Sequence, residues 1–536
     1  MVPNINQTKN AQRKNSGATN LLYLFLAVSI ALLGFLFLGL YSMNHQRTSG
    51  LKQDQEVSEL FFYCAAGLRK AVEKIAADYE KEYGVRIQLQ YGGSNTLLSQ
   101  IEISRTGDLY LAADESYIEL AQKKNLVEES IAVAFLKPVI GVARGNPKNI
   151  TDIDSLLKPG IKIALANPDQ AAVGKKTRKF LTRSGHWKRL ETLTREKGVF
   201  KPTVTEIAND VKIGSVDAAI IWDATAAQYS EIDAIPIPEL NSGRSSITAG
   251  ILKSSKNPTA ALKFARYLSS RDQGLKHFES FGYEIIEGDI WKEVPELTFY
   301  AGSVNRRTLE PILKTFSERE GLDINTVYNG CGILTAQMNS IKSSQGSGFP
   351  DFYMACDVYY LDTVKDWFQD AVNVTNTDIV LVVQKGNPKN IRNIDDLKKQ
   401  GIRIAVGQPD QCTIGVLTRK LLETEGVYQE LLKENIVTQT LTSALLIPNV
   451  TTKSVDATFA YESDTLFEQD KLDIIRIDSP AAKAVQPYSI SQSSDFKYLG
   501  RRLFKKIADS RELFEEAGFN WQLPSDGTNE SNTDTP

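Results

Sequence analysis

One long uncharged apolar segment near the start of the chain is the first feature of its hydrophobic pattern. Residues 21–41 read LLYLFLAVSIALLGFLFLGLY, and a helix needs about 20 such residues to span a bilayer. Lys9, Arg13 and Lys14 precede the segment, whereas its other flank mixes both charge signs. This bias predicts that residues 1–20 are cytoplasmic and that the body lies outside. The alternative, a cleaved signal peptide, has a shorter apolar region and a small-residue cleavage site, so we expect an uncleaved anchor.

Beyond this segment, short apolar runs alternate with stretches of helical periodicity. Residues 60–63 predict a buried strand. Apolar residues then recur at helical spacing at Val72, Ile75, Ala76, Tyr79 and Tyr83 before Gly84, and again at Leu309, Ile312, Leu313 and Phe316 before Gly321. Glycine at such a position favours the end of a helix. Runs such as IKIALA and RIAV, each followed by Pro-Asp and a helix-like segment, predict βα units. The pattern therefore predicts α/β modules with a mixed, mainly parallel sheet.

The chain is also a duplication. FYCAAGLRKAVEKIAADYEKEYGV aligns without gaps to FYAGSVNRRTLEPILKTFSEREGL, GNPKNI occurs twice, and SVDAAIIWD returns as SVDATFAYE. Such self-similarity indicates two copies of one structural unit. We expect a first module at 57–284, a linker at 285–296 and a second module at 297–523. The polar residues 524–536 predict a disordered tail.

Composition excludes several classes of protein. The formal net charge of the 536 residues is −3 and no basic run interrupts the body, which argues against a nucleic-acid partner. Four cysteines without a CxxC pair and three histidines predict neither a zinc site nor a dense disulfide framework. The chain contains no HExxH, GxSxG or P-loop motif. We therefore expect a binding protein without a cofactor, not an enzyme.

Four loops of the first copy follow predicted strands and begin predicted helices. They are CAAGLRK, YGGSNTLL, ANPDQAAVGKK and IIWDAT. Loops at the carboxyl ends of strands are where α/β folds bind ligands, and helix N-termini favour anions. Gly92 and Gly93 allow close approach of a backbone, and Ser94 offers a hydroxyl, either to a ligand or as a helix N-cap. Residues 171–174 would open a helix with several free amides.

The order of these motifs resembles the molybdate-binding receptors of ABC transporters. The resemblance rests on CAAGL, GGSNTL, ADESY, GNPKN, NPDQAAVG and WDAT in the first copy, and on YAGSV, NGCGIL, ACDVYY, GNPKN, QPDQCTIG and AYESDT in the second. It covers nearly all of both copies. It implies two tandem periplasmic-binding-protein-like (type II) modules, each with two lobes and a ligand cleft between them.

The resemblance also implies ligand-binding residues. In the first copy they are Gly67, Ser94, Ala172, Val173 and Trp222; in the second they are Ser303, Cys331, Thr413 and Tyr461. Gly67 stands where the family has its first serine, and Trp222 where it has tyrosine.

Two further expectations concern acidic and cysteine residues of the same loops. Asp114 and Asp357 would repel an anion, so we expect them to serve a hinge or hydrogen-bonding role. Cys356 aligns with Ala113, so three cysteines fall in loops that converge on one cleft. An oxidising compartment would permit a disulfide between Cys331 and Cys412.

The function that the resemblance implies is capture of a tetrahedral oxyanion, molybdate or tungstate, on the extracytoplasmic side of the cell membrane. The partners would be an ABC permease and its ATPase subunits. The alternative is a membrane-tethered ligand sensor or scaffold that uses the same modules without transport.

Overall fold

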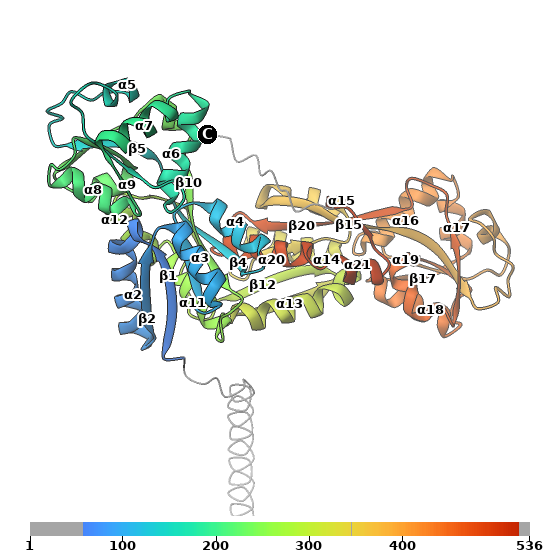
Figure 1. The fold of residues 1–536 in the computed structure, drawn as a ribbon. Helices are drawn as coiled ribbons and strands as arrows, with labels where there is room; N and C mark the ends of the chain where they lie inside the picture. Colours follow the sequence, from blue (N-terminus) through green and yellow to red (C-terminus); the bar gives the residue numbers. More distant parts are fainter. Residues whose placement is uncertain (1–56, 345, 525–536) are drawn as a thin grey trace, which may run out of the picture. The chain divides into compact units, whose positions relative to one another are not determined.

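The computed structural model describes residues 57–344 and 346–524, and it shows two α/β modules in tandem, each with two lobes (Figure 1). The predicted membrane anchor at 21–41 lies outside the described residues, as do residues 1–20 and 525–536. Within the described ranges, no helix combines the length and apolar character that crossing a membrane requires.

The first lobe of the first module is built on a six-stranded sheet in the order β11-β4-β10-β3-β1-β2. Its strands are β1 (Glu59–Ala65), β2 (Arg86–Gly92), β3 (Leu109–Ala112), β4 (Val127–Leu136), β10 (Ser245–Leu252) and β11 (Glu284–Ile285). Its helices are the short 3₁₀ helix η1 (Ala66–Leu68), α2 (Arg69–Tyr83), α3 (Ser94–Ser104), α4 (Glu115–Lys123), α11 (Pro258–Leu268) and α12 (Gly274–Ser280). Strand β1 pairs in parallel with β2 and β3, whereas β10 is antiparallel to β3 and β4, so the sheet is mixed.

The second lobe of this module has a five-stranded sheet in the order β7-β6-β8-β5-β9. Its strands are β5 (Pro138–Ala143), β6 (Ile163–Ala166), β7 (Val199–Lys201), β8 (Ala218–Trp222) and β9 (Ile232–Ile235). Its helices are α5 (Ile153–Leu156), α6 (Ala172–Arg183), α7 (Trp187–Lys197), α8 (Val204–Lys212), α9 (Asp223–Ala227) and α10 (Pro238–Asn241). The chain enters this lobe between β4 and β5 and leaves it between α10 and β10, so two short crossings join the lobes.

The second module repeats this order on one continuous ten-stranded sheet. Its strands are β12 (Glu296–Gly302), β13 (Asp323–Asn329), β14 (Phe352–Met354), β15 (Phe368–Gln384), β16 (Ile404–Gly407), β17 (Ile436–Thr440), β18 (Ala457–Tyr461), β19 (Leu472–Arg476), β20 (Lys483–Ser491) and β21 (Asn520–Trp521). Its α-helices are α13 (Arg306–Glu320), α14 (Cys331–Ser343), α15 (Val358–Asp362), α16 (Thr413–Thr424), α17 (Tyr428–Glu434), α18 (Leu446–Thr451), α19 (Glu462–Thr465), α20 (Lys497–Ala508) and α21 (Arg511–Glu516). Its 3₁₀ helices are η2 (Ser303–Asn305), η3 (Lys365–Trp367), η4 (Asp395–Lys398), η5 (Ser443–Leu445) and η6 (Leu466–Glu468).

A single position explains why the sheet is divided in one module and continuous in the other. Strand β15 runs through both lobes of the second module, and the N–H of Ile379 donates to the carbonyl oxygen of Ala482 at 2.8 Å. Pro138 occupies the equivalent position of the first module. Proline has no N–H to donate, and there the chain is split into β4 and β5.

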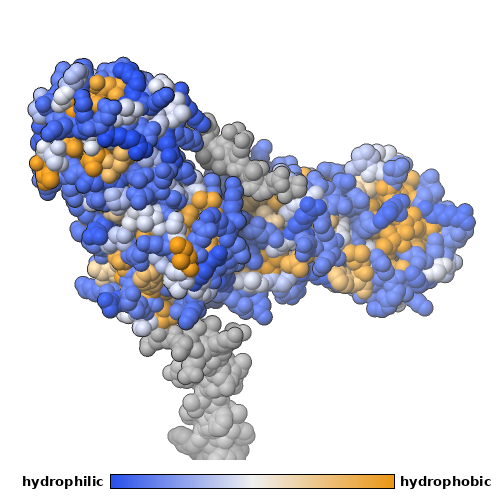
Figure 2. All heavy atoms as spheres, in the orientation of Figure 1, coloured by the Kyte–Doolittle hydropathy of each residue, from blue (hydrophilic) through white to orange (hydrophobic). Residues whose placement is uncertain are grey.

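The helical stripes read from the sequence are confirmed. Helix α2 buries Val72, Ile75, Ala76 and Tyr79 and ends at Gly84, whose φ is 69°. Helix α13 buries its four predicted residues and ends at Gly321, with φ 64°. Both glycines take the left-handed conformation that a residue with a side chain adopts only at a cost. The face drawn in Figure 2 is mostly hydrophilic with smaller apolar areas, as expected when the apolar stripes face the core.

Candidate functional site

The two lobes of the first module enclose a small cavity. Its empty space is about 270 Å³, part of it open to solvent. The residues that line it are Ala65, Ala66, Gly67, Gly92, Gly93, Ser94, Ala113, Ala171, Ala172, Thr203, Val204 and Trp222. The structure thus brings together four of the five residues expected in this copy, Gly67, Ser94, Ala172 and Trp222. Val173 is buried in the first turn of α6 and is not among the lining residues.

Two helix N-termini, one from each lobe, meet at this cavity. Helix α3 begins at Ser94 and helix α6 at Ala172. The first N–H groups of a helix have no partner within the helix, and the helix dipole is positive at that end. None of the lining residues carries a charged side chain. The cavity is therefore suited to a small anion held by neutral donors.

Ser94 is not the N-cap of its helix, because Gly93 takes that position. The Ser94 side chain is buried, and its Oγ accepts a hydrogen bond from the N–H of Ala113 at 3.3 Å. The phenolic hydroxyl of Tyr110 donates to the Ser94 carbonyl oxygen at 2.6 Å and fixes the backbone there. With Oγ accepting at Ala113, the hydroxyl proton of Ser94 remains available to a ligand.

A steric contact explains why residue 67 is glycine and not serine. A Cβ on Gly67 would lie 2.7 Å from Cγ1 of Val204, which comes from α8 in the other lobe. Real Cβ atoms do not approach that closely, so with a serine at position 67 the Val204 side chain or the lobe that carries it would have to shift. Gly67 therefore offers its backbone to the cavity, and its carbonyl oxygen accepts a hydrogen bond from Tyr283 at 2.7 Å.

At Gly93 the backbones of the two lobes approach closely. A Cβ there would lie 2.7 Å from the carbonyl oxygen of Pro202 and still closer to that of Gln170. Both oxygens belong to the second lobe, and Asn95 of α3 donates its N–H to the same Gln170 oxygen at 3.0 Å. The lobes can meet this tightly only because residue 93 has no side chain.

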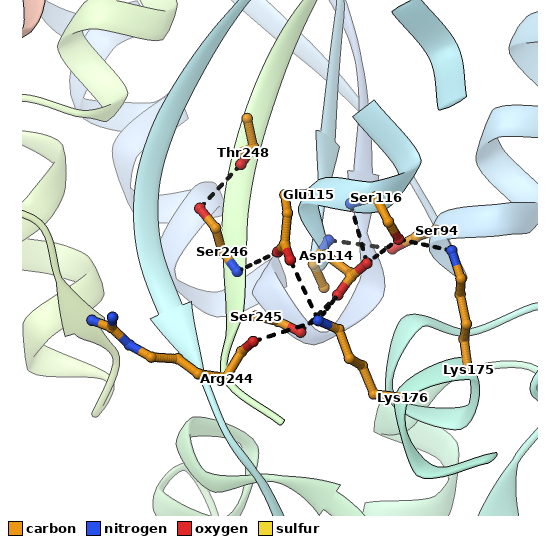
Figure 3. Close-up of polar contacts among 11 residues, drawn as sticks. Ser94, Asp114, Glu115, Ser116, Lys175, Lys176, Arg244, Ser245, Ser246 and Thr248 are labelled. Atoms are coloured by element: carbon orange, nitrogen blue, oxygen red, sulfur yellow. Dashed lines mark hydrogen bonds and ion pairs between the residues drawn. The ribbon is translucent and has the colours of Figure 1, made fainter. Parts of the chain in front are cut away.

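A buried ion pair lies beside the cavity and joins the lobes (Figure 3). Nζ of Lys176, on α6, is 2.7 Å from Oδ2 of Asp114, which caps α4 of the first lobe. Ser245 at the start of β10 donates its hydroxyl to the same oxygen at 2.8 Å. Lys176 Nζ also lies 3.4 Å from Oε1 of Glu115, and Lys175 donates to the Ser116 hydroxyl at 2.7 Å. We call the Asp114–Lys176 pair with Ser245 the lobe latch.

Each charge of the latch favours the charged form of its partner. Burial alone would raise the pKa of Asp114, but the Lys176 ammonium and the surrounding hydrogen bonds hold it below its usual value. Burial would likewise lower the pKa of Lys176, and the Asp114 carboxylate raises it above its usual value. Removing one partner of such a pair leaves the other charge buried and uncompensated. The expected hydrogen-bonding role of Asp114 is borne out by these contacts.

Thr203, Val204 and Lys176 were not among the residues selected from the sequence. Thr203 caps α8 and accepts from the N–H of Glu206 at 3.3 Å, a spacing of threonine and glutamate that is typical of a helix start. Val204 carries no such signal. A lysine one turn into a helix is usually solvated, so only the meeting of the two lobes identifies Lys176.

In the second module the four selected residues begin or end elements around the equivalent position. Ser303 begins η2, Cys331 begins α14, Thr413 begins α16 and Tyr461 ends β18. Cys331, Thr413 and Tyr461 are buried. Within the described residues, neither Thr413 Oγ1 nor the Tyr461 hydroxyl has a hydrogen-bond partner of good geometry.

The sulfur atom of Cys331 lies against Cys356, a neighbour that the sequence did not single out. Sγ of Cys331 lies 3.0 Å from Sγ of Cys356, whereas the sequence suggested Cys412. All four cysteines are free thiols in this structure. Cys412 caps α16, in the other lobe, while Cys331 and Cys356 both belong to the first lobe of the module.

Asp357 has the local role of Asp114 but not its ion pair. It caps α15 and accepts from the N–H of Tyr359, and its second oxygen accepts from the N–H of Val485, both at 2.9 Å. Burial raises its pKa above the usual value, the opposite direction to Asp114.

Comparison with known proteins identifies the family. The description "Bacterial extracellular solute-binding protein" matches the chain twice, at residues 60–284 and 297–520. A binding protein of Haemophilus influenzae is 30% identical over 230 residues, which are 42% of this chain and 91% of that protein. The molybdate-binding protein ModA of Escherichia coli is 24% identical over 42% of this chain and 88% of its own length.

Solved structures are similar over one module's length. The periplasmic molybdate-binding protein of Azotobacter vinelandii is 20% identical over 42% of this chain and 98% of its own, with a TM-score of 0.37. The sulfate-binding protein SubI of Mycobacterium tuberculosis is 18% identical over 43% of this chain and 88% of its own, also with a TM-score of 0.37. With two matches that together span most of its length, this chain belongs to the bacterial extracellular solute-binding protein family.

Proposed function

We propose that the first module captures a tetrahedral oxyanion, molybdate or tungstate, in the cavity between its lobes, and delivers it to an ABC importer. The observation that carries this proposal is the neutral lining of that cavity at the N-termini of α3 and α6. Burying an anion costs several kcal/mol unless donors replace its water shell. Free helix amides supply such donors without a titratable group.

Five residues at or beside the cavity would donate to the ligand. Ser94 donates its hydroxyl, and the amides of Gly67, Ala172 and Val173 donate from the first turns of η1 and α6. Trp222 stands at the end of β8, where its indole N–H is a further donor. The steric contact between Gly67 and Val204 supports an amide in place of the serine hydroxyl that the resemblance implies.

The lobe latch would favour the closed state. Its two charges lie in different lobes, so opening the cleft separates them. A ligand that contacts the helix N-termini of both lobes also shifts the equilibrium between open and closed states towards the closed state, because it binds the closed state better than the open one. The closed module is then the form presented to a permease and its ATPase subunits.

The arrangement proposed along the chain follows from the sequence. Residues 1–20 lie in the cytoplasm, 21–41 anchor the protein in the cell membrane, and the modules at 57–284 and 297–523 lie outside, joined by 285–296. Family members are binding proteins, and we propose binding without catalysis or a cofactor for this chain as well. In the second module Ser303, Cys331, Thr413 and Tyr461 would face a cleft whose ligand has changed or been lost, because a thiol is a weaker donor than a hydroxyl.

The test is a calorimetric titration of the full chain with molybdate, tungstate, sulfate and phosphate. Ser94→Ala should weaken molybdate binding by about 1 to 3 kcal/mol, the cost of losing one hydrogen bond to a charged group. The matched control is Cys331→Ala, the same position of the second module, which should leave the affinity unchanged.

The possible outcomes separate the alternatives. Equal affinities for wild type and Ser94→Ala would remove Ser94 from the site. No heat with any of the four anions would overturn the oxyanion proposal and favour a sensor or scaffold that reads another solute.

A further inference from the structure

Two thiols of the second module lie almost in bonding contact. Sγ of Cys331, at the start of α14, is 3.0 Å from Sγ of Cys356, which follows β14. The N–H of Cys356 donates to Sγ of Cys331 at 3.1 Å, so the backbone holds the second cysteine against the first. Both residues are buried, with 0% and 4% of their surface exposed.

The space for the two sulfur atoms depends on a third residue. Gly302 ends β12, and a Cβ placed on it would collide with the sulfur atoms of both cysteines. The aligned residues of the first module are Ala65, Ser94 and Ala113. Relative to the first copy, a methyl group is removed at the point where two sulfur atoms are added. The three differences fit together sterically, which indicates a built dithiol site and not three unrelated changes.

The surroundings favour reaction at one of the two thiols. Burial raises the pKa of Cys331, but its Sγ accepts the N–H of Cys356 at 3.1 Å and the net shift is below the usual value. Cys331 is also the first residue of α14, a position that favours a thiolate. The pKa of Cys356 is raised well above its usual value, first by its hydrogen bond to Cys331 and then by burial. Thiolates, not thiols, attack disulfides. Cys331 is therefore the nucleophile of the pair and Cys356 the thiol that keeps its proton.

We propose that Cys331 and Cys356 are a redox pair that closes to a disulfide by exchange with another disulfide compound. The Cys331 thiolate attacks one sulfur of that compound, a mixed disulfide forms, and one thiolate leaves and takes up the first proton. Cys356 then gives up its proton and attacks Cys331 Sγ, which releases the second thiol. Two protein thiols and one disulfide become one protein disulfide and two thiols, so atoms and electrons balance.

Because of where the two cysteines lie, a disulfide between them would not join the two lobes. Cys331 and Cys356 both belong to the first lobe, so their disulfide leaves lobe motion free. A bond from Cys331 to Cys412 would instead tie α14 to α16 across the cleft. The proposed disulfide changes the wall of the second cleft, since it removes the thiolate that would repel an anion. The inference stands independently of the ligand proposed for the first module.

The experiment uses the full chain in buffers of reduced and oxidised glutathione. After acid quenching and alkylation of free thiols in denaturant, proteolysis and mass spectrometry identify the linked peptides. We expect a peptide pair joined through Cys331 and Cys356, with Cys64 and Cys412 alkylated, so that free thiols fall from four to two per chain. Four free thiols in fully oxidised glutathione, or a Cys331–Cys412 link, would overturn the proposal.

Two variants test whether the disulfide joins Cys331 specifically to Cys356. Cys412→Ser should form the same link at the same glutathione ratio, because Cys412 lies outside the pair. Cys356→Ser should abolish every intramolecular link to Cys331 and leave Cys331 as the mixed disulfide with glutathione, with Cys64 and Cys412 as the two free thiols. A Cys331–Cys356 link that requires Cys412, or an intramolecular Cys331 link in Cys356→Ser, contradicts the assignment.

Discussion

The two modules have the same elements in the same order, yet they differ where their lobes meet. In the first module the buried carboxylate Asp114 pairs with Lys176 and accepts from Ser245. In the second, Asp357 is bonded to backbone N–H groups instead. The position of Lys176 is occupied by Leu417, and the strand register places Ala484 where the first module has Ser245. The carboxylate caps a helix in both modules, but only the first module has the partners of the latch.

A second difference is an exchange of bulk. In the first module Gly67 leaves room for Val204 across the cleft. The aligned residues in the second module are Val304 and Ser443, so the larger side chain is on the other lobe. In each module only one of the two facing positions holds a valine, and in the second module it lies on the first lobe. The two copies therefore share their buried apolar helix faces and their turns, whereas the contacts between their lobes differ.

The largest expected effect comes from replacing Lys176 of the lobe latch with leucine, the residue at the aligned position of the second module. Lys176→Leu leaves Asp114 buried without its counter-charge, which costs about 3 to 5 kcal/mol. We expect a lower melting temperature of the first module and weaker ligand binding, measured by calorimetry. Adding Asp114→Asn should recover part of the loss, because the double variant removes the uncompensated charge. A single variant as stable as wild type would show that the latch contributes nothing.

The next effect tests closure of the lobes. Gly93→Ala places a methyl group against two backbone oxygens of the second lobe, and overpacking of this kind costs about 1 to 3 kcal/mol. Since Gly93 has an ordinary φ of −67°, each lobe should still fold. Ligand affinity should therefore fall by 10- to 100-fold with little change in far-UV circular dichroism.

The matched control for closure is Gly330→Ala. A Cβ on Gly330 likewise meets the carbonyl oxygens of Gln411 and Leu441. It should hinder closure of the second cleft only, so affinity for the first module's ligand should stay the same. If both alanine variants weakened binding equally, the assignment of the site to the first module would be wrong.

The exchange of bulk can be reversed in a third test. Gly67→Ser alone should weaken binding by about 1 to 3 kcal/mol, because the new side chain meets Val204. The double variant Gly67→Ser, Val204→Ala makes room for the hydroxyl and should bind at least as tightly as wild type. Titration of both variants with molybdate measures the difference, and a double variant no better than the single one would contradict the steric explanation.

The smallest effect is on pH dependence. The pKa of Asp114 is lowered in the folded protein, so the stability it contributes is present above its unfolded value of about 3.9 and is lost as the pH falls through the folded value. The pKa of Asp357 is raised, so its contribution has the opposite sign. The melting-temperature difference between wild type and Asp114→Asn should shrink below about pH 4. A difference that stays constant from pH 7 to pH 3 would exclude the ion pair as its cause.

The sequence predicted the repeated fold well because local signals specify it. The apolar spacing in α2 and the glycine after it are enough to place the helix and its end. The convergence of Gly67, Ser94, Ala172 and Trp222 also followed, because each stands at the carboxyl end of a strand or the start of a helix. The sequence could not predict which residues of the two lobes contact each other.

The residues that sequence analysis missed are those whose role depends on contacts between the two lobes. Val204 touches the position of Gly67 and Lys176 reaches Asp114 only after the second lobe folds back over the first. The contact of Cys331 with Cys356 could not be predicted for the same reason, since alignment brings three cysteines to one cleft but cannot say which two sulfur atoms approach.

The most direct measurement is the amount of molybdenum bound per full chain at saturation, by equilibrium dialysis with elemental analysis. We expect one molybdate per chain, displaced by tungstate, with half-saturation at a 10- to 100-fold higher molybdate concentration in Gly93→Ala but unchanged in Gly330→Ala. No bound molybdenum, or two per chain with an equal shift in either variant, would contradict the claim that the neutral cavity of the first module is the oxyanion site.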